Sequence, residues 1–140
     1  MIKIIVPGIP VGKGRPRVMR RRGQKKGFTF TPKETAIWEN KVALCAYLHR
    51  PKKLFDCPLF MKVTFWFAKP KSRKKYEWPD RGKDLDNLVK GVCDALQGII
   101  YVNDSRIVGL AAIKRYGDPK TKIEIGKVGK VNTKMRQANF

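Results

Sequence analysis

Histidine is nearly absent from this sequence of 140 residues, and cysteine is rare. The single histidine, His49, argues against histidine-based zinc sites and against a Ser-His-Asp triad, and we expect it near a helix end. The three cysteines, Cys45, Cys57 and Cys93, leave one without a mate and form no C-x-x-C pair. We therefore expect reduced, mostly buried thiols and neither a disulfide framework nor a cysteine metal site.

Long hydrophobic runs are also missing, since no apolar stretch approaches the roughly 18 residues that a membrane span needs. The first ten residues, MIKIIVPGIP, begin a strand and lack the charged and then apolar design of a signal peptide. The length suits one domain with a modest core. We expect a cytoplasmic protein with no membrane partner.

Acidic residues are few compared with basic ones. The chain has 11 Asp and Glu against 32 Lys and Arg, and its formal net charge is +21. Such self-repulsion destabilises a compact state unless a polyanion offsets it. No segment combines a basic face with a strongly apolar one, which argues against a membrane surface. The balance therefore indicates nucleic acid as the partner.

Apolar periodicity and turn residues predict an α+β fold, with elements in the order β-α-β-α-β-β. The expected strands span 2–7, 59–67, 107–116 and 122–126, the expected helices span 31–48 and 84–97, and 117–120 is expected to be a hairpin turn. The simplest packing is a small mixed sheet with two helices on one face. In the first helix we expect a capping box at Thr31 and Glu34, with Pro32 at the first helical position.

The two helices differ in how clearly they mark a buried face. The first is expected to bury Ile37, Trp38, Val42, Leu44, Cys45 and Leu48. The second follows an i, i+3, i+4 stripe of Leu85, Leu88, Val89, Val92 and Leu96.

Three segments concentrate positive charge. Eight cations and no acid occur from Lys13 to Lys26, within a basic loop at 13–27 whose part from Arg20 to Gly27 reads as a mobile loop or hairpin tip. The connection 69–83 holds seven cations, together with Tyr76 and Trp78. The tail 127–140 carries four cations and no acid, so we expect a folded domain at 1–126 and a partly disordered tail.

Five of the eleven acids fall between residues 80 and 104: Asp80, Asp84, Asp86, Asp94 and Asp104. Clustered carboxylates would repel phosphate if the chain only had to hold DNA. A hard cation between them removes the conflict, because Mg2+ binds carboxylate and phosphate oxygens together. Asp86, Lys90 and Asp94 are spaced four apart and share one helix face. The pattern suggests a metal-dependent phosphodiester site.

Ordinary structural roles explain the same residues one at a time. Asp84 is suited to cap a helix, Asp86, Lys90 and Asp94 to form a solvated salt-bridge ladder, and Asp104 to occupy a turn. Spacing alone leaves both interpretations open.

The acidic run resembles the signature of the RusA family of endodeoxyribonucleases. It reads DLDNLVKGVCDAL from Asp84 to Leu96 and is followed by Gln97-Gly98 and by Tyr101-Val102-Asn103-Asp104. The N-terminal GKGRPR, at residues 12–17, resembles the opening segment of that family. The likeness covers about residues 2–125. The loop 20–26 and the long tail depart from the family pattern.

The resemblance implies a homodimer of prokaryotic or phage origin that resolves Holliday junctions by paired, symmetric nicks with Mg2+, for which Mn2+ substitutes. It implies that Asp84, Asp86 and Asp104 bind the metal and that Lys90 is the catalytic lysine. Asp94 also lies within the matching stretch, and we expect a structural or supporting role for it. We expect the ion to activate water and Lys90 to stabilise the developing charge. Lys13, Arg15 and Arg17 are expected to hold flanking phosphates.

Two rival functions remain open. A non-enzymatic nucleic-acid-binding protein would explain the charge, although it gives no reason for the D-x-D-N-x-x-K array. A structure-specific nuclease acting on other branched DNA would explain both. Tyr76 and Trp78 are suited either to packing or to stacking on an opened base.

Overall fold

The structure is a computed structural model that describes residues 1–14, 17–19, 28–30 and 33–129, with backbone alone for 17–19 and 28–30. Its strands are β1 (Ile2–Pro7), β2 (Arg17–Met19), β3 (Phe28–Phe30), β4 (Leu59–Phe67), β5 (Ile107–Tyr116) and β6 (Lys120–Lys127). Its α-helices are α1 (Lys33–Tyr47) and α2 (Leu85–Leu96), and two short 3-10 turns are η1 (Lys71–Arg73) and η2 (Asp104–Arg106). The predicted order of the main elements is confirmed, with the β2–β3 hairpin added.

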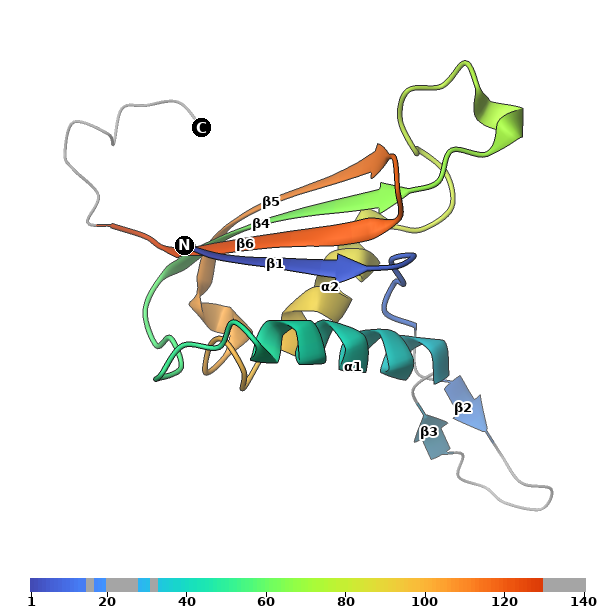
Figure 1. The fold of residues 1–140 in the computed structure, drawn as a ribbon. Helices are drawn as coiled ribbons and strands as arrows, with labels where there is room; N and C mark the ends of the chain where they lie inside the picture. Colours follow the sequence, from blue (N-terminus) through green and yellow to red (C-terminus); the bar gives the residue numbers. More distant parts are fainter. Residues whose placement is uncertain (15–16, 20–27, 31–32, 130–140) are drawn as a thin grey trace.

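Four strands form one mixed sheet in the order β1-β6-β4-β5. β4 and β5 are parallel, whereas β1 with β6 and β4 with β6 are antiparallel. Both α-helices lie beneath the same face of this sheet (Figure 1). The predicted α+β class, with two helices on one face of a small mixed sheet, is therefore confirmed.

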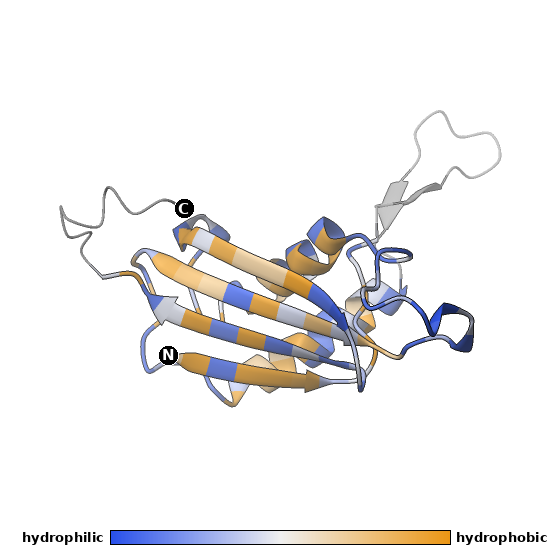
Figure 2. Ribbon diagram, turned by 90° about the horizontal axis from the view of Figure 1, so that it is seen from above, coloured by the Kyte–Doolittle hydropathy of each residue, from blue (hydrophilic) through white to orange (hydrophobic). Residues whose placement is uncertain are grey.

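The core lies between the sheet and the helices. Alternate residues of a strand point to one face, and on β4 those facing the helices are fully buried: Leu59, Met61, Val63 and Phe65. Val63 pairs in register with Ile123 of β6 and with Ala112 of β5. Figure 2 looks onto the opposite face of the sheet, with the helices behind it.

The predicted hairpin at 117–120 is wrong. β5 and β6 follow one another in the chain, yet β4 lies between them in the sheet. The segment 117–119 crosses the end of β4, where the Gly117 N–H donates to the Phe67 carbonyl at 2.9 Å. The Gly-Asp-Pro composition correctly marks a reversal. It does not encode that an earlier strand would take the place beside β5.

The prediction for the buried face of α1 is only half correct. Trp38 and Val42 are buried, but Ile37 and Leu44 are 57% and 71% exposed, and Leu48, beyond the helix end, is 82% exposed. The small residues Thr35 and Ala46 complete the buried face instead. Apolar residues occur around most of α1, so its periodicity did not identify one face. Thr31 and Pro32 of the predicted capping box lie outside the described residues.

The three cysteines are unbonded, as predicted, but they are half-buried and not buried. His49 follows the end of α1, where its N–H donates to the Ala46 carbonyl at 2.9 Å, which confirms the expected helix-end position. None of the described helices is long and apolar enough to cross a membrane. Of the basic segments, 20–27 and 130–140 lie outside the described residues.

Candidate active site

Helix α2 positions most of the candidate residues. Its buried side is formed by Leu88, Val89, Val92, Ala95 and Leu96, while Leu85 is half-buried. The predicted apolar stripe is thus confirmed apart from the partial exposure of Leu85. Packing of this stripe turns Asp86 and Lys90 outward, and both are exposed.

Asp84 is the N-cap residue of α2, as predicted. Its backbone is extended, with φ −72° and ψ 132°, but its side chain makes no capping hydrogen bond. Ordinary N-cap aspartates accept a hydrogen bond from a backbone N–H of the first turn. The capping interpretation therefore does not account for this carboxylate, which is exposed.

Asp86, Lys90 and Asp104 line one surface depression of about 560 Å³. Leu85, Val89 and Cys93 of α2 and Leu110 and Ala112 of β5 form its remaining wall. Two carboxylates and one ammonium group thus share a largely apolar recess, although Asp86 and Asp104 are 18 residues apart in the chain. The structure brings these three predicted residues together.

Asp84 lies in a neighbouring depression of about 390 Å³. This second recess is lined by Gly12, Lys13, Gly14, Lys83 and Asn87, among others. The four predicted catalytic residues are therefore divided between two recesses on either side of the start of α2.

Within the described part of the chain, none of Asp84, Asp86, Lys90 and Asp104 has an ion-pair partner within 4.0 Å. Asp94 instead pairs with Lys13 at 3.0 Å. The salt-bridge ladder of Asp86, Lys90 and Asp94 is therefore wrong for this structure. Asp84, Asp86 and Asp104 are exposed, so their carboxylates are open to solvent and to a ligand.

Asp104 is held in place by residues to which the sequence assigned no role. It is the first residue of η2, immediately before β5, and its backbone N–H donates to Gln97 Oε1 at 3.2 Å. Asn103 accepts a hydrogen bond from the Ser105 N–H at 2.9 Å, which fixes the turn. The Arg106 guanidinium bonds Asp56 at 2.6 Å, tying η2 to the segment before β4. The expected turn position of Asp104 is confirmed.

Cys93 lines the recess, but its thiol is unreactive at neutral pH. Burial, together with the nearby negative charge of Asp104, raises the pKa of the Cys93 thiol to about 11. The buried Tyr101 hydroxyl donates to the Cys93 carbonyl at 2.7 Å, and burial likewise raises its pKa. A thiol protonated at neutral pH is a poor nucleophile and a poor metal ligand. The reactive groups of the recess are therefore its carboxylates and Lys90.

The G-K-G segment is fixed against both helices beside Asp84. The Lys13 N–H donates to the Asn87 carbonyl at 3.0 Å, and the Gly14 N–H donates to Thr35 Oγ1 at 3.0 Å. A Cβ atom at Gly12 would lie 3.5 Å from that of Asn87, an ordinary van der Waals contact. The predicted basic segment and the acidic helix are thus adjacent, although 70 or more residues separate them in the chain.

The Lys13 ammonium is turned toward carboxylates. It lies 2.7 Å from Glu39 and 3.0 Å from Asp94, and the hydrogen bond to Glu39 raises its pKa. A phosphate would compete with these partners, and a phosphate contact by Lys13 stays a prediction. Arg15 and the side chain of Arg17 lie outside the described residues.

The three predicted metal ligands do not form one cluster. Among the described residues, no three His, Cys, Asp or Glu side chains group closely enough to hold a metal ion. The recess with Asp86 and Asp104 nevertheless offers a fitting donor set for Mg2+. This ion commonly takes one or two carboxylates and fills its other positions with water and substrate phosphate oxygens.

The fold and the site together define a small, basic α+β domain whose recess holds two carboxylates and one lysine. Residues 7–126 match the family described as endodeoxyribonuclease RusA. The chain belongs to this family, as the acidic run predicted.

Two relatives are similar to this chain, and the name of the first agrees with this assignment. A crossover junction endodeoxyribonuclease rusA of Lactococcus phage r1t is 37% identical over 91 residues, covering 61% of this chain and 69% of the phage protein. The uncharacterized protein YqaN of Bacillus subtilis (strain 168) is 37% identical over 139 residues, covering 91% of this chain and 96% of that protein.

Proposed function

We propose that this protein is a Mg2+-dependent endodeoxyribonuclease that resolves Holliday junctions by paired, symmetric nicks. The observation that carries the proposal is the recess shared by Asp86, Asp104 and Lys90, whose charged groups have no ion-pair partner within 4.0 Å among the described residues. Family membership and the phage relative's name support DNA junctions as the substrate.

The residues of the recess divide the chemistry between them. Asp86 and Asp104 would hold Mg2+. We propose that Asp84, from the neighbouring recess, is the third carboxylate that binds the ion, because its side chain makes no capping hydrogen bond. When bound, the ion supplies Lewis-acid activation of water and phosphate; Mn2+ is expected to substitute. The Lys90 ammonium stabilises negative charge that develops on the phosphoryl oxygens, and such preorganised stabilisation is typically the largest catalytic effect.

Substrate binding is proposed to rest on the basic surface. Lys13, Arg15 and Arg17 are proposed contacts for flanking phosphates, which position duplex arms without reading bases. We also propose a homodimer, because a four-way junction offers two equivalent strands and a twofold dimer presents two matching sites. Light scattering of the purified chain would give twice the monomer mass if this is correct and the monomer mass if it is not.

Cleavage of end-labelled DNA of four designs tests the function. A four-way junction, a replication fork, a flap and a linear duplex of matched sequence are each incubated with Mg2+, Mn2+ or EDTA. We expect two symmetric nicks in the junction with either ion, none with EDTA, and an intact duplex. Faster cutting of the fork or flap than of the junction would favour a nuclease for other branched DNA. Tight binding without cutting under either ion would favour a non-enzymatic DNA-binding protein.

A further inference from the structure

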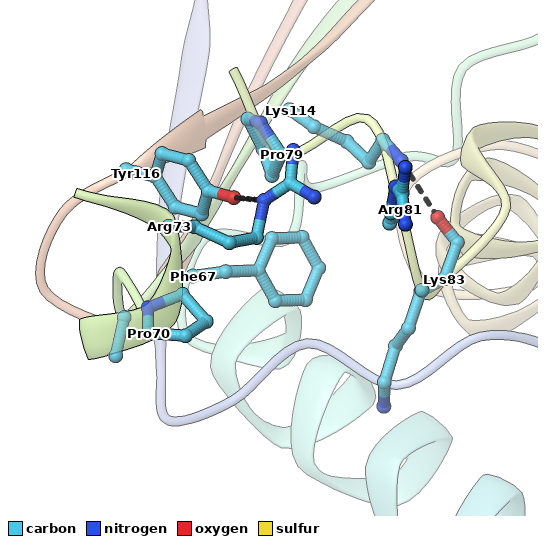
Figure 3. A pocket seen from close by; sticks show the side chains of 10 residues that line it. Phe67, Pro70, Arg73, Pro79, Arg81, Lys83, Lys114 and Tyr116 are labelled. Atoms are coloured by element: carbon cyan, nitrogen blue, oxygen red, sulfur yellow. Dashed lines mark hydrogen bonds between the residues drawn. The ribbon is translucent and has the colours of Figure 1, made fainter. Parts of the chain in front are cut away.

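A separate pocket of about 330 Å³ lies where β4 and β5 end, beside the connection 69–83. Phe67, Pro70 and Tyr116 give it apolar and aromatic walls, and Arg73, Arg81 and Lys114 surround them with positive charge (Figure 3). This volume falls within the roughly 300–1,000 Å³ range of small-ligand pockets. None of the catalytic residues proposed above lines it.

Hydrogen bonds give the pocket a fixed shape. Arg73 Nε donates to the Tyr116 hydroxyl at 3.1 Å, and the same guanidinium forms an ion pair with Asp80. Lys114 Nζ donates to the Lys83 carbonyl at 2.8 Å, which ties the end of the connection to β5. The connection therefore folds back on the sheet and forms one wall of a preformed cavity.

The pocket and the acidic recess are neighbours along β5. Leu110 and Ala112 line the recess, and Lys114 and Tyr116 line the pocket. These four are alternate residues of one strand, so they project from one face, and each is about 6.6 Å from the next. Lys83, another lining residue, immediately precedes Asp84. A DNA strand with its phosphate at the recess therefore has its adjoining nucleotide within reach of the pocket.

The lining matches the chemistry of a nucleotide. Flat rings at Phe67 and Tyr116 suit a base that has left its stack, and stacking of this kind tolerates any base. Among the described residues, neither Arg81 nor Lys83 has an ion-pair partner within 4.0 Å. Their charges are thus available to the phosphates on either side of that base.

We propose that this pocket receives a base unstacked from the DNA strand beside the phosphate that is cut. The proposal rests on the proposed nuclease function and adds a binding subsite to it. A base held in this way fixes the strand at the recess, since the pocket and the carboxylates share β5.

Binding of modified junctions in EDTA tests the subsite without cleavage. Each junction carries one abasic residue at a successive position around the crossover, and its affinity is compared with that of the intact junction. For the wild type, we expect one position where removing the base weakens binding roughly 5- to 150-fold, the range that base stacking gives. If every abasic junction binds within twofold of the intact one, the proposal is overturned.

Variants locate the effect. Tyr116→Leu, which removes the ring, and Ala68→Trp, which fills the pocket from its rim without deleting a contact, should both reduce the base-to-abasic ratio to below twofold. Tyr47→Leu, at an exposed tyrosine on α1 that does not line the pocket, should leave it unchanged. Arg81→Gln should weaken the binding of intact and abasic junctions by the same factor, because in this proposal Arg81 contacts a phosphate and not the base.

If both Tyr116→Leu and Ala68→Trp keep the wild-type ratio of affinities for intact and abasic junctions, the proposal that this pocket binds the base is overturned. Cleavage of the same junctions with Mg2+ is scored separately. Nicking with no base dependence would refute the subsite while the nuclease function stands. Base-dependent binding with no nicking would support the subsite and refute the nuclease function.

Discussion

Lys13 Nζ lies 3.0 Å from Asp94 Oδ2, and this ion pair joins the N-terminal glycine segment to α2. Glu39 of α1 completes the arrangement at 2.7 Å from the same ammonium. Lys13 and Asp94 are each less than one-third exposed, so solvent screens their interaction only in part. The contact explains why Asp94 sits inside the acidic run without facing the recess, consistent with the supporting role expected of it.

Replacing Lys13 by Met is expected to lower the free energy of unfolding by about 1–3 kcal/mol, because Glu39 and Asp94 would be left close together without a cation. Urea unfolding measures the change. Lys33→Met, at an exposed lysine of α1, is the control and should stay within about 0.5 kcal/mol of the wild type. Equal stability of Lys13→Met and wild type would contradict the structural role of the ion pair.

The same ion pair has a defined pH dependence. The pKa of Lys13 is raised above its ordinary value of 10.5. A raised pKa means that the stabilisation is fully present below 10.5 and is lost only as the pH rises through the folded-state value. The stability difference between wild type and Lys13→Met should therefore be constant from about pH 7 to pH 9 and shrink above pH 10.5. A difference that stays constant through pH 11 and above would show that the pKa is not raised.

Asp84→Ala should be nearly neutral for stability although it changes an N-cap residue. Loss of a capping side chain typically costs about 1 kcal/mol, but Asp84 makes no capping hydrogen bond. We expect a change below about 0.5 kcal/mol in urea unfolding together with a large loss of junction cleavage. A stability loss of a full kcal/mol would indicate that the carboxylate caps the helix in solution.

Lys90→Met is expected to slow junction cleavage about 100-fold or more while changing junction affinity little. The reason is that Lys90 stabilises charge that exists only as the reaction proceeds, and deletion of one such donor has effects of this size. Single-turnover cleavage and equilibrium binding separate the two quantities. Lys74→Met, which removes an exposed cation of the connection, serves as the control for lost positive charge. Equal losses of affinity and rate in Lys90→Met would point to a phosphate-holding role.

Cys93 should be alkylated slowly at neutral pH, with a rate that is still climbing at pH 10. Its pKa of about 11 follows from burial and from the charge of Asp104, and only the thiolate reacts. Iodoacetamide labelling followed by peptide mass spectrometry gives the rate at this residue. A rate that levels off near pH 8.5 would mean that the thiol is more solvated than the structure shows.

Sequence periodicity predicted the elements whose neighbours impose one clear pattern. α2 has a single apolar stripe, and in β4 Lys62 and Thr64 alternate with apolar residues, so both were located correctly. α1 has apolar residues on several sides, and the positions of Ile37 and Leu44 could be decided only by where the sheet lies. The place of β4 between β5 and β6 is likewise a long-range property, whereas turn composition reports only local backbone direction.

The charged residues of the candidate site could be predicted from the sequence, but how they are grouped in space could not. The acidic cluster and the family resemblance pointed to Asp84, Asp86, Lys90 and Asp104, and three of these line one recess. The division that places Asp84 in the next recess depends on the backbone at the start of α2. The Gln97 contact to Asp104 and the wall that β5 contributes to the recess are tertiary features, which the local sequence pattern does not encode.

Single-turnover cleavage of a labelled four-way junction by Asp86→Asn and Asp94→Asn tests whether the recess is the catalytic site. The two variants make the same chemical change on one helix, eight residues apart, but only Asp86 lines the recess while Asp94 pairs with Lys13. With Mg2+ and saturating protein, below the unfolding temperature of both variants, Asp86→Asn should bind the junction and cut it at least about 100-fold more slowly than wild type. Asp94→Asn should cut within a few-fold of wild type. Wild-type rates from Asp86→Asn, or an equal loss in both variants, would contradict the assignment of this recess as the catalytic site.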